Sequence, residues 1–73
     1  MANPTTMKEI AQDARESFKR GGLDAMRNQC QFWLARRGMY VPSDTVWDGW
    51  CQASVRNLTQ FLEEKAKPLV GQQ

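Results

Sequence analysis

The sequence predicts an all-α fold, a compact arrangement of three helices over residues 6–20, 23–37 and 44–66. Two observations predict it. Within each range, apolar residues recur at the 3.6-residue spacing of an amphipathic helix. Glycine or proline follows each range, and both residue types commonly end helices. We expect no strand, internal repeat or linker.

The first predicted helix begins with a capping box. The Thr6 hydroxyl can accept a hydrogen bond from the Glu9 amide, and the Glu9 side chain can reach back to the cap. The apolar stripe behind this cap is Met7, Ile10, Ala11, Ala14 and Phe18. Because two of these residues are alanine, the stripe is thin. An alternative arrangement is therefore a hairpin of the second and third helices, with the first helix docked loosely on it.

The second predicted helix starts at Leu23 after the Gly21-Gly22 pair. Its stripe is Leu23, Met26, Cys30, Trp33 and Leu34. Gly38 is the expected C-cap, because glycine takes the left-handed conformation at little cost. The connection that follows, residues 39–42, is unusually apolar for a loop.

The third predicted helix is the longest. Ser43 or Asp44 is its expected N-cap, and Pro68 marks the point beyond which it cannot continue. Its stripe is Trp47, Trp50, Cys51, Ser54, Leu58, Phe61, Leu62 and Lys65. The three tryptophans of the chain all lie on such stripes, so we expect them in the core. The alternative places Trp47 and Trp50, at the start of this helix, at a binding surface.

Length and composition indicate a single small domain over residues 1–73, with frayed ends at 1–5 and 69–73. The net charge is +2, which is well short of the strongly basic character of a dedicated nucleic-acid binder. No apolar run is long enough for a transmembrane span, and the N-terminus does not read as a signal peptide, so we expect a cytoplasmic protein. In that compartment Cys30 and Cys51 are expected as reduced, buried thiols.

Motifs of enzymes and of metal sites are absent from the sequence. It contains no phosphate-binding glycine loop, no nucleophile elbow and no histidine, which is the commonest general base and a frequent metal ligand. Asp44 and Asp48 are one helical turn apart, but two carboxylates fall short of the oxygen ligands that a hard cation needs. We expect no enzymatic activity, no cofactor and no metal.

Phe32 is the residue that departs from the helical pattern. It lies about 150° from the stripe of the second helix, on a polar face with Arg36 one turn away. The same part of the chain carries an excess of positive charge and the apolar loop. The predicted partner-binding surface is Phe32, Arg36, Arg37, Tyr40 and Val41. The alternative is that the middle helix is covered on two sides and Phe32 belongs to the core.

The chain resembles small regulators that lytic bacteriophages encode to bind the RNA polymerase of their host. The resemblance rests on the 73-residue length, the Met1-Ala2-Asn3-Pro4 start, the tryptophan-rich helical pattern and the absence of enzyme motifs. It implies contact with the largest catalytic subunit, near its zinc-bearing N-terminal region and the RNA exit channel. It further implies inhibition of transcription initiation and antitermination, in the cytoplasm of the bacterial host.

Two other functions stay open from the residues alone. One is a small DNA-binding repressor built on a helix-turn-helix, although the connection from Gly38 to Ser43 is longer than usual for that motif and Asp44 and Asp48 would face phosphates. The other is a module that binds a different host protein. We expect a monomer, with any direct contact to nucleic acid secondary.

Overall fold

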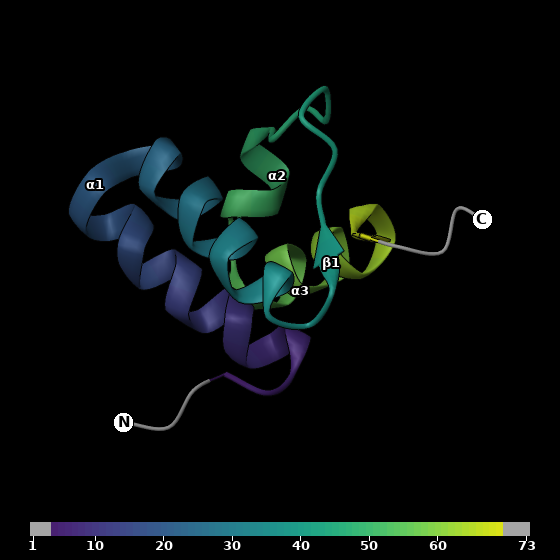
Figure 1. Ribbon diagram of the computed structural model, residues 1–73. Coiled ribbons are helices and arrows are strands. Elements are labelled where there is room, and N and C mark those ends of the chain that lie inside the picture. The colour runs from purple at the N-terminus through teal and green to yellow at the C-terminus, as the bar shows by residue number, and fades with distance from the viewer. Residues whose placement is uncertain (1–3, 70–73) are drawn as a thin grey trace.

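The computed structural model describes residues 4–69 and shows a mostly helical fold with a small two-stranded sheet (Figure 1). The elements, in chain order, are α1 (Met7–Ala35), β1 (Met39–Tyr40), α2 (Gly49–Gln52), α3 (Val55–Lys65) and β2 (Lys67–Pro68). The predicted helical character is confirmed. The prediction of a purely all-α fold is wrong because of the sheet.

The long element α1 consists of two helical arms joined at Gly22. The backbone of Gly22 is not helical, with φ 81° and ψ −165°, a conformation that glycine reaches without a side-chain clash. Figure 1 shows the arms, coloured purple to teal, folded back beside each other. The boundary between the first two predicted helices therefore falls where the sequence placed it.

The predicted capping of α1 is confirmed only in part. The Glu9 amide donates to the Thr6 hydroxyl at 3.2 Å, as expected for the N-cap. The Glu9 carboxylate instead accepts from the Thr5 amide at 2.7 Å and the Thr5 hydroxyl at 2.9 Å. These hydrogen bonds lower the pKa of Glu9. At the other end, the helix stops at Ala35 instead of residue 37, and its C-cap is Arg36 instead of the predicted Gly38. Gly38 lies two residues further on and takes a φ of 74°, which glycine adopts without a side-chain clash.

The predicted continuous helix over 44–66 is wrong. Residues 44–48 are not helical, α2 has only four residues, and Ala53 and Ser54 separate it from α3. Two side chains cap the new starts. Asp48 accepts from the amides of Trp50 and Cys51, and Ser54 accepts from the amide of Asn57. Local capping by short polar side chains therefore overrides the 3.6-residue apolar period, because these residues compete with the helix for its own backbone groups.

The sheet closes the fold after α3. Met39 pairs with Pro68 and Tyr40 with Lys67 in an antiparallel ladder. A residue that precedes proline is pushed toward extended backbone, so Lys67 cannot continue the helix. The predicted frayed ends at 1–5 and 69–73 lie largely outside the described residues. Leu69, which is described, donates its amide to the carbonyl of Gly38 at 2.8 Å.

The core lies where both arms of α1 meet α3. Ile10, Ala11 and Ala14 are fully buried on the first arm, so this arm is packed firmly rather than loosely. The other core residues are Met26, Cys30, Leu34, Val41, Cys51, Leu58, Phe61 and Leu62. Most residues of the predicted apolar stripes are thus buried or packed against the core, even though the third helix is interrupted.

Candidate functional site

Phe32 lies on the outer surface of the second arm of α1 and is 51% exposed. Its ring meets the ring of Trp33 edge to face, with centroids 4.9 Å apart and an interplanar angle of 75°. The Arg36 guanidinium carbon lies 5.4 Å from the Phe32 centroid and 5.9 Å from the Trp33 centroid. These distances are within the range of cation–π attraction. We call this group of three side chains the Phe32 platform.

The Phe32 platform is anchored to the first arm of α1. The Trp33 indole N–H donates to the Asp13 carboxylate at 2.8 Å, and the Gln29 amide donates to the same oxygen at 2.6 Å. Trp33 is half-buried and packs against the core. The indole is therefore held by its hydrogen bond to Asp13 and by its contacts with the core. The phenyl ring of Phe32, which packs against the indole, has a defined orientation as a result.

The structure divides the five residues predicted to bind a partner. Phe32 and Arg36 lie together in the Phe32 platform. Arg37 is exposed, and its guanidinium donates to the carbonyl of Thr5, so it also ties down the N-terminal segment. Tyr40 is partly exposed in β1, opposite Lys67.

Val41 does not belong to an open surface. It is 1% exposed and is part of the core. Its backbone is fully occupied as well, because the Gln31 side chain donates to the Val41 carbonyl at 2.7 Å and accepts from the Val41 amide at 3.0 Å. The apolar character of the loop at 39–42 predicts a contact surface. At Val41 its hydrophobicity instead serves burial.

A second group of exposed apolar residues includes Trp50, which the sequence predicts together with Trp47 as an alternative binding surface, and Val46, which it does not predict. Trp50 is 48% exposed and Val46 is 75% exposed. They line a hollow of about 490 Å³, which we call the Trp50 hollow. Its lining residues are Asp44, Thr45, Val46, Asp48, Trp50, Phe61, Glu64 and Lys65. The prediction that all three tryptophans are core residues is therefore wrong for Trp50, which lies in the short α2 and not in a continuous third helix.

Trp47 and Trp33 are neither fully buried nor exposed. Trp47 is half-buried and packs on Phe61, with ring centroids 4.8 Å apart. Trp33 is half-buried against Asp13. Both tryptophans contribute to packing, as their position on the apolar stripes predicted.

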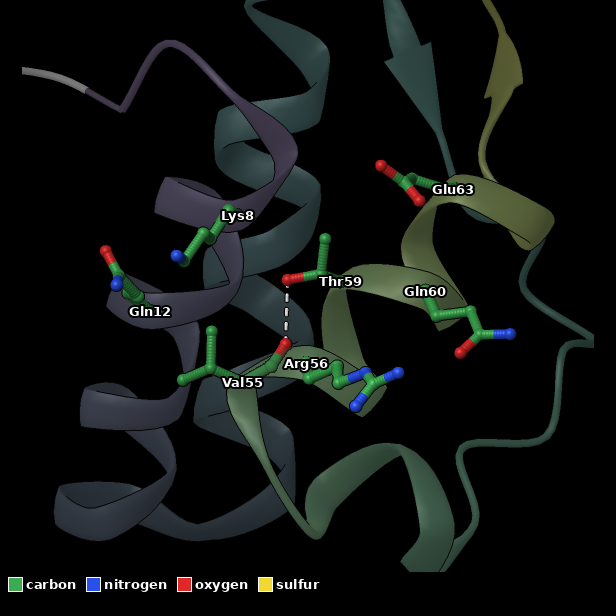
Figure 2. A pocket seen from close by; sticks show the side chains of 7 residues that line it. All are labelled: Lys8, Gln12, Val55, Arg56, Thr59, Gln60 and Glu63. Carbon is green, nitrogen blue, oxygen red and sulfur yellow. Dashed lines mark hydrogen bonds between the residues drawn. The ribbon is translucent and has the colours of Figure 1, made fainter.

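A groove of about 690 Å³ runs between the first arm of α1 and α3 (Figure 2). Lys8 and Gln12 form one wall, and residues of α3 form the other. The Thr59 hydroxyl that borders it donates to the Val55 carbonyl at 2.7 Å. Figure 2 shows the Arg56 head group pointing away from α1. The polar groups of this groove do not converge on a common point, so it indicates no particular ligand.

The two cysteines are free and buried, as predicted. Burial raises the pKa of the Cys30 thiol to about 12, with smaller contributions from Cys51 and Asp13. Burial also raises the pKa of Cys51, whose Sγ donates to the Asp48 carbonyl at 2.9 Å. Both thiols therefore stay protonated at neutral pH, and a protonated, buried thiol is a poor nucleophile.

Residues 4–69 contain no group of three or more histidine, cysteine, aspartate or glutamate side chains that could hold a metal ion. Within the same residues, no helix combines the length and the apolar character needed to cross a membrane. No protein-family model, curated protein or solved structure matches this chain.

Proposed function

We propose that this protein is a non-enzymatic regulator that acts by binding another protein in the bacterial cytoplasm, and that its partner is the host RNA polymerase. The exposed, anchored Phe32 carries the first part of this proposal. The resemblance to phage regulators supplies the partner, and with it inhibition of initiation and antitermination through the largest subunit of the polymerase.

Phe32 has the properties of an interface anchor. Half of its surface is open to a partner, yet its position is already defined by Trp33 and Arg36. Binding therefore orders few additional side chains, which lowers the entropic cost of association. Aromatic and arginine residues supply most of the energy of many interfaces from a small area. This is the chemistry that a short regulatory chain needs to hold a large partner.

The test is the affinity of the full chain for purified bacterial RNA polymerase. Phe32→Ala should weaken binding by about 1–2 kcal/mol, the range of an interface anchor. Leu69→Ala is the matched control, because Leu69 is also an exposed apolar residue, at 46% against 51% for Phe32, and lies outside the platform. Equal affinity of the two variants would remove Phe32 from the interface. No binding of the parent chain to the polymerase would remove the proposed partner.

Charge at the platform has a separate expected effect. Arg36→Glu should mainly slow association and make it less sensitive to salt, because it removes a charge that steers the encounter. Transcription from a promoter and across a terminator, with and without the parent chain, tests the regulatory consequence. Initiation should fall and read-through should rise.

The runner-up function, a DNA-binding repressor, receives less support from the fold. A helix-turn-helix needs a second helix directly after a short turn. Here the helix that follows β1 has only four residues and begins at Gly49, and residues 44–48, the predicted start of the third helix, are not helical. Steep salt dependence of binding to random duplex DNA would favour this function instead.

A further inference from the structure

The Trp50 hollow combines two kinds of surface that the proposed function does not use. One part is apolar and exposed, and the other is acidic. We propose that this hollow is a second docking surface, and that its occupant is a basic peptide segment of a partner protein in which lysine or arginine stands beside an apolar residue. This proposal does not depend on the identity of the partner that binds the Phe32 platform.

The apolar part consists of Trp50 and Val46. An exposed tryptophan offers a large apolar face to a partner and a face that attracts cations. Val46, at 75% exposure, lies in the non-helical segment before α2, where a solvated connection ordinarily carries polar residues. The Asn57 side chain donates to the Trp50 carbonyl at 3.1 Å and so connects α2 to α3. The Trp50 backbone is therefore held in place while its ring remains open.

The acidic part determines which partner fits. Asp44, Asp48 and Glu64 line the hollow, and Lys65 is the single cation among the lining residues. The ion pairs of residues 4–69 are Lys19–Glu16 and Arg27–Asp24, so none of these three carboxylates has a cationic partner within 4.0 Å in that part of the chain. The whole chain has a net charge of +2, so this negative surface opposes the overall charge of the protein.

The spread of the carboxylates favours a peptide over a metal ion. They do not gather into a group that could hold a metal within the described residues. Separate carboxylates beside a tryptophan suit a cationic side chain, which gains from the nearby negative charges and from the indole face together. The hollow, at about 490 Å³, has the size of a site for a few side chains rather than a folded domain.

The two surfaces of the protein therefore select opposite partners. The Phe32 platform presents Arg36, and the Trp50 hollow presents three carboxylates against one lysine. A segment that suits one surface is repelled by the other. If the arginine peptide does not bind the Trp50 hollow, the proposal for the Phe32 platform is therefore unaffected, and the reverse also holds.

The probe for the test is an acetylated, amidated pentapeptide of alternating arginine and leucine. Its counterpart has glutamate in place of arginine. Calorimetry gives the affinity for the full chain, and the Trp50 indole N–H resonance in a nitrogen-15 NMR spectrum gives the location. The arginine peptide should bind and shift that resonance, whereas the glutamate peptide should do neither. Absence of binding by the arginine peptide at about 1 mM, a concentration that reveals even weak complexes, overturns the proposal.

Charge reversal separates the hollow from general electrostatic attraction. The double variant Asp44→Lys with Glu64→Lys should weaken binding at least about tenfold, because it removes the charges that face the peptide. The matched control, Glu16→Lys with Glu63→Lys, changes the net charge by the same amount at exposed positions that do not line the hollow. Equal weakening by the two double variants overturns the proposal.

Trp50→Ala tests the apolar part and should also weaken binding at least about tenfold, as expected for an aromatic anchor. Melting temperatures of all variants show whether each is folded, and the charge-reversal pair keeps the test decisive if Trp50→Ala is not. Sedimentation of the parent chain adds a last outcome. If it associates with itself and the Asp44→Lys, Glu64→Lys variant does not, the occupant is a second copy and the proposed peptide partner is wrong.

Discussion

The indole N–H of Trp33 donates to the carboxylate of Asp13 at 2.8 Å, across the two arms of α1. The pair is separated by 20 residues in sequence, and Gln29 donates to the same carboxylate oxygen at 2.6 Å. One side chain thus fixes two residues of the opposite arm. Since Trp33 supports the ring of Phe32, the same contact also orients the candidate interface.

Asp13→Ala should therefore lower both stability and partner affinity. Removing the carboxylate leaves the Gln29 and Trp33 donors without their protein partner, and an unsatisfied, partly buried donor costs about 1–3 kcal/mol. Urea denaturation measures the change in the free energy of unfolding. The matched control is Glu16→Ala, on the same arm, where the carboxylate is exposed and pairs with Lys19. Equal losses for both variants would contradict a special role for Asp13.

The two N-caps that interrupt the third predicted helix provide a second test. Ser54→Ala should destabilise the protein by about 1 kcal/mol, because the Ser54 hydroxyl accepts from the amide of Asn57 at the start of α3. Ser43→Ala is the control. The sequence predicts Ser43 or Asp44 as a cap, but Ser43 lies in an exposed turn and no helix begins there. If Ser43→Ala cost more than Ser54→Ala in thermal melts, the predicted long helix would be favoured over the observed break.

Several features of the fold depend on residues that are close together in the sequence and are therefore predictable from it. The N-cap at Thr6, the turn at Gly22 and the burial of Leu58 follow from short-range rules, because each depends on residues close together in the chain. The break at Ser54 could have been anticipated from Ser54 and Asp48 as capping residues.

Other features depend on contacts between distant residues. The pairing of Gln31 with the Val41 backbone converts a predicted surface residue into a core residue, and nothing local to Val41 signals it. The sheet depends in the same way on β1 meeting β2. At the candidate site, the off-stripe position of Phe32 correctly predicted exposure. Its support by Trp33 and Asp13 required the fold.

Leu58 is the residue by which the core prediction is best tested. It is fully buried at the centre of the predicted stripe, in α3. Leu58→Ala should lower the free energy of unfolding by about 2–5 kcal/mol, through lost burial and the cavity left behind. Denaturant melts measure the loss. Thr59→Ala, at the next position of the same helix and only half-buried, should cost less. A loss below about 1 kcal/mol for Leu58→Ala, smaller than typical core truncations, would show that this stripe is not the core.

The buried thiol of Cys30 makes stability depend on alkaline pH. Its pKa is about 12 in the folded protein, against an ordinary value of 9.0, because burial disfavours the thiolate. A pKa that is raised by folding contributes stability that is fully present below pH 9.0 and is lost as the pH rises toward about 12. The unfolded chain releases the proton in this window, whereas the folded chain retains it. Unfolding should therefore become easier between these pH values.

Cys30→Ala isolates this effect from other groups that titrate at alkaline pH. The variant should start less stable at neutral pH, because it removes a buried side chain from the core. Its stability should then fall less steeply than that of the parent as the pH rises above 9.0, since the titrating thiol is gone. Urea denaturation across the pH range measures both slopes. Parallel slopes for the two proteins would contradict this prediction. They would mean that Cys30 ionises as easily in the folded chain as in the unfolded one, despite its complete burial in the core.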